Sequence, residues 1–187
     1  MSLCEHTYNF DLGVGYLSGK DGYLLLSGLS QHYPFLHGNK DVQITPRGHS
    51  FTVTGISAKE AQQMQNGWAK IGDRMIAWMQ YDKRIFRPSP TLYSPFVLVR
   101  MDEGVTEEGF DEGVRSILDE FYPGATFQRG DLRVLPFKEK RFIGWEVTIE
   151  NLTADQSVLL QSRGLGRWRS CGCGNFRPAR LARAEAA

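Results

Sequence analysis

Apolar and polar residues alternate most clearly between residues 143 and 150, which predicts a strand with one buried side. A helix is predicted from Thr106, because its apolar residues share one helical face and Pro123-Gly124 follows them. Thr153 and Gln156 have the spacing of a capping box and open a second helix. This half of the chain is predicted to run strand, helix, strand, strand, helix, strand, at residues 92–101, 106–121, 126–135, 143–150, 153–162 and 171–176.

The first half of the chain repeats this order. Asp21 precedes a predicted helix that Pro34 closes, since the residue before a proline is driven out of the helical region. Ser57 and Glu60 form another predicted capping box. The predicted elements lie at residues 4–17, 21–33, 42–44, 51–54, 57–64 and 71–79.

Each half therefore has the element order of a ferredoxin-like domain. We expect an α+β protein with two such domains in tandem. Prolines and polar residues between 82 and 91 predict the connection. The expected divisions are a first domain at 1–84, a linker at 85–91, a second domain at 92–178 and a tail at 179–187.

The composition is that of an ordinary globular chain, with 187 residues of which 41% are hydrophobic and 23% charged. No apolar run approaches the roughly 20 residues of a membrane helix. The first six residues lack the basic and apolar regions of a signal peptide, so we expect a cytoplasmic protein. Three cysteines make no disulfide framework. Cys171 and Cys173 have no second Cys/His pair near them, so we expect neither a metal site nor a cofactor.

Charge is segregated along the chain, although the net charge is only +1. Acidic residues gather between 102 and 120, where the dipole of the predicted helix favours them at its start. Between residues 129 and 183, eleven basic residues stand against five acidic ones. Such segregation can form a positive face for a polyanion, or the basic side chains can simply be solvated one by one.

A glycine-rich segment at residues 164–174 contains two Gly-x-Gly steps, separated by five residues that include arginines and a tryptophan. Glycine permits positive φ and a close approach of the backbone to a ligand. Successive backbone N–H groups and arginine side chains suit phosphate, and a tryptophan offers a stacking face for a base. The segment therefore favours an RNA ligand. The alternative is a flexible turn between a helix and a strand.

The chain resembles the repeat-associated mysterious proteins of CRISPR systems. The resemblance rests on the tandem ferredoxin-like order and on the pattern Gly164-x-Gly166-x5-Gly172-x-Gly174. Gly28-Leu29, Pro34-Phe35-Leu36-His37 and Pro90-Thr91-Leu92-Tyr93 resemble the CRISPR repeat-processing endoribonucleases in particular. The resemblance implies metal-independent cleavage of precursor CRISPR RNA within its repeats, by attack of a 2′-OH, to give a 2′,3′-cyclic phosphate and a 5′-OH.

The resemblance makes His37 the candidate catalytic residue, since the family has a histidine just past the first helix. Histidine suits proton transfer because its ordinary pKa of about 6.5 lies near neutrality. His32, one helical turn before Leu36, is the second candidate. The family often has a tyrosine and a lysine in supporting roles, for which Tyr33, Lys40 and Arg47 are possible substitutes. His6 and His49 are expected to be structural or exposed.

Candidate RNA-binding residues come from two places. The first is the glycine-rich segment, and the second is the connection at residues 137–142, which in the family grips the base of the repeat stem. The candidates are Arg163, Gly164, Gly166, Arg167, Trp168, Arg169, Gly172, Gly174, Lys138, Lys140 and Arg141.

Three functions remain open from the sequence. The first is an endoribonuclease that binds precursor and mature CRISPR RNA. The second is a non-cleaving RNA-binding subunit of a CRISPR effector complex, which would have other subunits as partners and no need of His37. The third is a ferredoxin-like protein that binds a metabolite or a protein, which the arginines around Trp168 disfavour.

Overall fold

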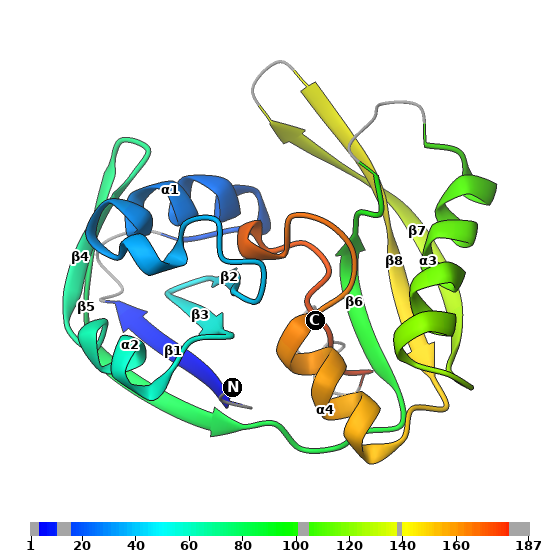
Figure 1. Cartoon of the computed structure of the whole chain (residues 1–187). Helices are drawn as coiled ribbons and strands as arrows, with labels where there is room; N and C mark the ends of the chain where they lie inside the picture. The colour runs from blue at the N-terminus through cyan, green and yellow to red at the C-terminus, as the bar shows by residue number, and fades with distance from the viewer. Residues whose placement is uncertain (1–3, 11–15, 101–104, 138–139, 180–187) are drawn as a thin grey trace. The chain divides into compact units, whose positions relative to one another are not determined.

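The computed structural model describes residues 4–10, 16–100, 105–137 and 140–179 (Figure 1). Contacts between Cα atoms divide the chain into two compact units. Unit 1 consists of Met1–Phe86 and Arg169–Gly172, and unit 2 of Arg87–Trp168 and Cys173–Ala187. Each unit has one antiparallel sheet with two α-helices packed against it, so the predicted α+β fold with two ferredoxin-like units is confirmed.

The sheet of unit 1 has five strands in the order β2-β3-β1-β5-β4. Its strands and helices are β1 (Cys4–Phe10), α1 (Gly22–His32), β2 (Gln43–Arg47), β3 (Ser50–Thr54), α2 (Ala58–Gln63), β4 (Gly67–Ile71) and β5 (Arg74–Ile85). Strands β2, β3, β1 and β5 have the ferredoxin-like order, and β4 is an additional strand at the edge. The short 3-10 helices η2 (Gly19–Asp21) and η3 (Pro34–Leu36) flank α1.

The core of unit 1 lies between its sheet and its two helices. Tyr8, Phe51 and Trp78 pack ring against ring on three neighbouring strands, and the Phe51 and Trp78 centroids are 5.0 Å apart. Leu25 and Leu29 of α1 are fully buried in the same cluster. This packing fixes α1 over the sheet and so determines where its C-terminal end lies.

Two predictions for unit 1 are wrong in part. The single strand predicted at 71–79 is a hairpin, in which β4 begins at Gly67 and β5 extends to Ile85. The turn between them uses Gly72 with a φ of +60°, a backbone conformation that favours glycine. The strand predicted at 4–17 ends at Phe10, and residues 11–15 lie outside the described residues.

The sheet of unit 2 has four strands in the ferredoxin-like order β7-β8-β6-β9. Its elements are β6 (Leu92–Val97), α3 (Glu107–Phe121), β7 (Thr126–Phe137), β8 (Lys140–Glu150), α4 (Ala154–Arg163) and β9 (Arg177–Pro178). Phe110 of α3 packs against Trp145 of β8, with 4.6 Å between the ring centroids. The capping box of Thr153 and Gln156 is confirmed at the start of α4.

The last strand of unit 2 lies at Arg177–Pro178 and not at the predicted residues 171–176. Those residues are held in turns by their glycines. Gly172 and Gly174 have φ angles of +95° and +62°, which are incompatible with an extended strand.

The two ends of the glycine-rich segment are held together within unit 2. The N–H of Leu165 donates to the carbonyl oxygen of Gly174 at 3.0 Å, and the N–H of Arg167 donates to that of Leu98 at 2.6 Å. A Cβ on Gly174 would lie 1.8 Å from the Leu165 oxygen. The backbones of Leu165 and Gly174 therefore lie closer together than a residue with a Cβ at position 174 would permit.

The middle of the glycine-rich segment, residues 169–172, belongs to unit 1. There the 3-10 helix η4 (Arg169–Cys171) packs against α1 and β2. A Cβ on Gly22, the first residue of α1, would lie 1.8 Å from the carbonyl oxygen of Cys171. The absence of a side chain at Gly22 is therefore a condition for η4 to pack at the start of α1.

We expect Gly22→Ala to destabilise the protein and to release residues 169–172. Overpacking of this kind costs about 1–3 kcal/mol, which outweighs the gain of about 0.5–1 kcal/mol from replacing a helical glycine. Urea unfolding measures the loss of stability, and limited trypsin digestion after Arg169 measures the release. Gly19→Ala is the matched control, because nothing lies within 4 Å of a Cβ at Gly19. Equal unfolding midpoints and digestion rates for the two variants would contradict this account.

Candidate active site

His37 lies directly after η3, with its side chain exposed. Pro34 begins η3 and keeps α1 from continuing, and the N–H of His37 donates to the Pro34 carbonyl oxygen at 3.0 Å. The neighbouring Leu36 is 1% exposed and fixes this turn in the core. The local sequence thus presents the imidazole to solvent on a constrained backbone.

His32 is the last residue of α1, and its side chain is also exposed. Its ring meets the indole of Trp68 on β4 edge to face, with 4.4 Å between the centroids. Tyr33 follows in a half-buried position, where burial raises the pKa of its phenol. Tyr33 is therefore a hydrogen-bonding group rather than a proton acceptor near neutral pH.

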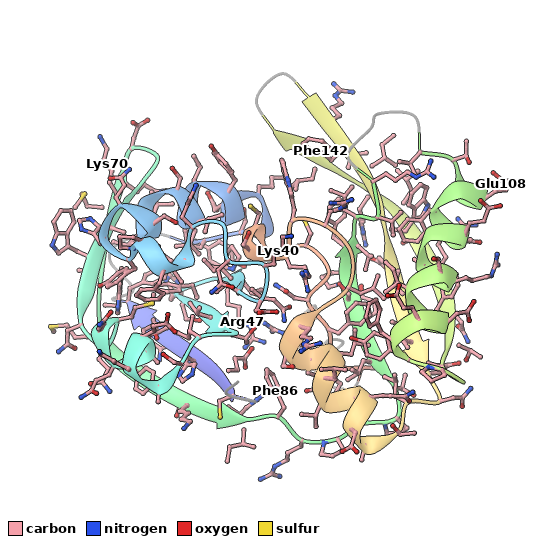
Figure 2. All side chains as sticks on the ribbon, in the orientation of Figure 1. Lys40, Arg47, Lys70, Phe86, Glu108 and Phe142 are labelled. Atoms are coloured by element: carbon pink, nitrogen blue, oxygen red, sulfur yellow. The ribbon has the colours of Figure 1, made fainter. Side chains whose placement is uncertain are left out.

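Arg169 lies beside the loop that carries His37. Its guanidinium group donates a hydrogen bond of 2.7 Å to the carbonyl oxygen of Lys40, three residues after His37. Both residues belong to unit 1, and Lys40 is labelled in Figure 2. The structure therefore brings a cation of the glycine-rich segment to the loop of the predicted catalytic histidine.

The remaining histidines of the first unit have structural surroundings, as expected. His6 is 1% exposed, and its Nδ1 lies 2.7 Å from the hydroxyl oxygen of Tyr81. Burial, followed by the charge of Lys83, lowers the pKa of His6. His49 is half-buried, with its ring 5.9 Å from that of Tyr16. Neither histidine has the exposed side chain that His37 has.

Arg47 and Lys40, which the sequence analysis considers for a supporting role in catalysis, differ in their surroundings. Arg47 lies 3.8 Å from Glu5, whose side chain is buried, so the arginine compensates a carboxylate within the protein. Lys40 has an exposed side chain. Of the two, Lys40 is the better placed to contact a substrate.

The candidates in unit 2 are exposed to different degrees. Arg163 ends α4 and Arg167 follows in the glycine-rich segment, and both side chains are exposed. Trp168 is half-buried, with a φ of +55° and its ring 4.5 Å from that of Phe142. One side of this indole thus serves packing, which leaves only part of the ring for a ligand.

The predicted connection at residues 137–142 is the hairpin between β7 and β8. Arg141 is exposed there and pairs with Pro136 in the strand register. Lys140 begins β8, and Lys138 lies outside the described residues. The structure therefore supplies Arg141 as an accessible cation of this hairpin.

Trp68 is the residue of this region that sequence analysis missed. Its strand, β4, was not predicted, so nothing indicated that an aromatic side chain would reach His32. The only sequence signal for this strand is that Trp68 and Lys70 alternate with Ala69 and Ile71. Four residues of alternation are too few to predict a strand.

Within its described part, the chain has neither a cluster of metal-ligating side chains nor a membrane-spanning helix. No cluster of three or more His, Cys, Asp or Glu side chains suited to a metal ion occurs among residues 4–10, 16–100, 105–137 and 140–179. Within the same ranges, no helix has the length and apolar character needed to cross a membrane.

Similarity to known proteins extends over most of the chain. A curated relative is the CRISPR-associated endonuclease Cas6 of Myxococcus xanthus (strain DK1622), 25% identical over 185 residues, with 87% of this chain and 77% of the relative covered. A solved CRISPR associated protein Cas6 has a TM-score of 0.62 at 11% identity, covering 94% of this chain and 98% of its own. A RAMP protein binding different RNA substrates has a TM-score of 0.61 at 8% identity, with coverages of 93% and 98%.

The structural likenesses support the tandem fold, and the sequence comparison identifies the family. The family model described as Cas6 Crispr matches residues 53–181, which is more than half of the 187 residues. On this ground the chain belongs to the Cas6 family of CRISPR proteins.

Proposed function

We propose that this protein is an endoribonuclease that cleaves precursor CRISPR RNA within its repeats to give mature CRISPR RNA. The relative from Myxococcus xanthus is named an endonuclease, which supports an enzyme over a pure binding subunit. The single observation that carries the proposal is the exposed His37 on a constrained turn after α1, with Arg169 bound to the same loop. Cleavage by this route needs no metal ion.

The proposed reaction is attack by the 2′-OH that precedes the scissile phosphate. A general base removes the 2′-OH proton and a bond forms from that oxygen to phosphorus. A general acid gives a proton to the leaving 5′-oxygen as its bond to phosphorus breaks. The products are a 2′,3′-cyclic phosphate and a 5′-OH. His37 acts as the principal proton-transfer residue, because its side chain is exposed and histidine commonly serves as a general acid or base.

His32 is proposed as the second proton-transfer group. It is exposed at the end of the same helix, and its contact with Trp68 restricts the orientation of its ring. Lys40 carries a positive charge on the loop that follows His37, and Arg169 of η4 brings a second one by binding the carbonyl oxygen of Lys40. Fixed cations of this kind stabilise the additional negative charge on phosphorus in the transition state.

RNA binding is proposed for the exposed arginines of unit 2 and for the glycine-rich segment. Arg163, Arg167 and Arg141 are exposed and have guanidinium groups suited to phosphate, and Lys138 and Lys140 precede Arg141 in the sequence. Gly164, Gly166, Gly172 and Gly174 all have positive φ, which lets the segment turn tightly. Most backbone N–H groups of the segment already donate to backbone carbonyl oxygens, so the expectation of an N–H cradle for phosphate is not met and the phosphate contacts are proposed for the arginine side chains. Trp168 offers the exposed part of its ring to a base.

A non-cleaving subunit of an effector complex is the competing function. Such a subunit shares the fold and the basic segment but has no use for an exposed histidine at position 37. Cleavage therefore separates the two functions, whereas RNA binding alone does not.

We expect His37→Ala to lower the single-turnover cleavage rate of repeat RNA by about 100-fold or more, the usual effect of removing a general acid–base group. The dissociation constant for RNA should stay nearly unchanged, because the side chain contributes to chemistry and little to affinity. The assay is run in EDTA, with gel analysis of the cyclic-phosphate end. His49→Gln is the matched control and should cleave like the wild type. Equal rates for wild type and His37→Ala would disprove the site, and tight binding without cleavage by either would favour the non-cleaving subunit.

We expect Arg167→Ala to weaken RNA binding and to reduce its salt dependence. Loss of one phosphate contact lowers the slope of log affinity against log salt by about 0.7 for single-stranded RNA. The cleavage rate at saturating RNA should be retained, because this arginine binds RNA and does not touch the reacting atoms. Arg115→Ala, an exposed arginine on α3, is the control and should change neither quantity. An unchanged salt slope for Arg167→Ala would exclude it from the RNA interface.

A further inference from the structure

Trp68 is a large aromatic side chain on the surface of the edge strand β4, with 53% of its surface exposed. Its ring is in contact with that of His32 at 4.4 Å between centroids. A buried position would explain a tryptophan by packing alone, but about half of this indole is presented to solvent. Trp68 is therefore a candidate for ligand contact.

The position of Trp68 is fixed by a close contact between α1 and β4. A Cβ on Gly28 of α1 would lie 2.3 Å from the carbonyl oxygen of Lys70, so the helix backbone rests directly on the strand. A Cβ on Gly67 would lie 2.3 Å from the hydroxyl oxygen of Tyr33. Two glycines thus bring the end of α1 onto β4, and the indole beside His32 is held on a rigid support.

The surroundings of Trp68 carry positive charge. Lys70, which Figure 2 labels, is exposed. It lies two residues further along β4 than Trp68 and hence on the same side of the strand. The residues opposite these two in the hairpin register are Ala77 and Met75, which carry no charge. An aromatic face next to a cation and a histidine suits a nucleotide, whose base can stack while its phosphate meets the positive charge.

We propose that Trp68, supported by His32 and with Lys70 beside it, is a stacking site for one nucleobase of single-stranded RNA that flanks the cleavage point. This inference rests on the proposed function, because it places the flanking nucleotide next to the second proton-transfer residue. The stacked base holds its neighbouring phosphate close to His32. A base of any identity fits, since every base has a π face.

The test combines protein variants with modified RNA. Trp68→Ala is expected to weaken binding of repeat RNA by about tenfold, the lower range for loss of one stacked base. Trp68→Phe keeps an aromatic face and should retain most of the affinity, which separates stacking from a folding defect. Phe121→Ala is the control, because Phe121 of α3 is also an exposed aromatic residue, at 50%, and has no part in the proposed site.

Replacing single nucleotides of the repeat by abasic nucleotides identifies the stacked base. At one position, the abasic substitution should weaken binding to the wild type but cause no further loss with Trp68→Ala, since the two changes remove the same contact. The proposal would be overturned if Trp68→Ala bound RNA as tightly as the wild type. It would also be overturned if, at every RNA position, the abasic substitution weakened binding to Trp68→Ala as much as it weakens binding to the wild type. The proposed cleavage can fail independently: a wild type that binds without cutting would refute the nuclease function, while the binding measurements would still decide the stacking site.

Discussion

The contact of helix α1 with two other backbones is the constraint on which the first unit depends. At its start, Gly22 lies against the carbonyl of Cys171, and further along, Gly28 lies against that of Lys70. Any side chain at either position would clash with a carbonyl oxygen, because its Cβ would lie only 1.8 or 2.3 Å away, which is shorter than a van der Waals contact. Leu25 and Leu29 occupy the core between these contacts, so the helix has little freedom to shift.

The candidate chemistry follows from the position of this helix. Its C-terminal end carries His32, and the η3 turn that Pro34 begins then presents His37 to solvent. The Gly22 contact keeps residues 169–172 in unit 1, where Arg169 binds the carbonyl of Lys40. The Gly28 contact brings β4 and Trp68 to His32. One helix thus brings together the two histidines proposed for proton transfer, a cation and an aromatic face, although the cation and the aromatic residue come from segments distant in sequence.

Local chemistry made much of the fold predictable, and tertiary contacts account for what was missed. The capping boxes at Ser57 and Thr153 gave two helix starts, because each cap forms within four residues. The sequence does not predict the β4–β5 hairpin, because the short edge strand β4 shows little alternation of polar and apolar residues. The sequence wrongly predicts a strand at residues 171–176, because the positive φ angles of Gly172 and Gly174 depend on tertiary packing and cannot be recognised from the sequence. For the candidate site, His37 was found through a family resemblance, whereas the contacts of Trp68 and Arg169 arise from residues far apart in the chain.

The proposed cleavage requires that the 2′-OH of the RNA itself is the nucleophile and that the protein supplies proton transfer and positive charge. The most direct measurement is single-turnover cleavage, in EDTA, of repeat RNA carrying one 2′-deoxynucleotide immediately before the cleavage point. The account predicts that this RNA binds with the affinity of the unmodified RNA and is not cut, while a deoxynucleotide one position further away leaves cleavage intact. Cleavage of the 2′-deoxy substrate at the same bond would contradict the account, because another nucleophile would then have to attack the phosphate.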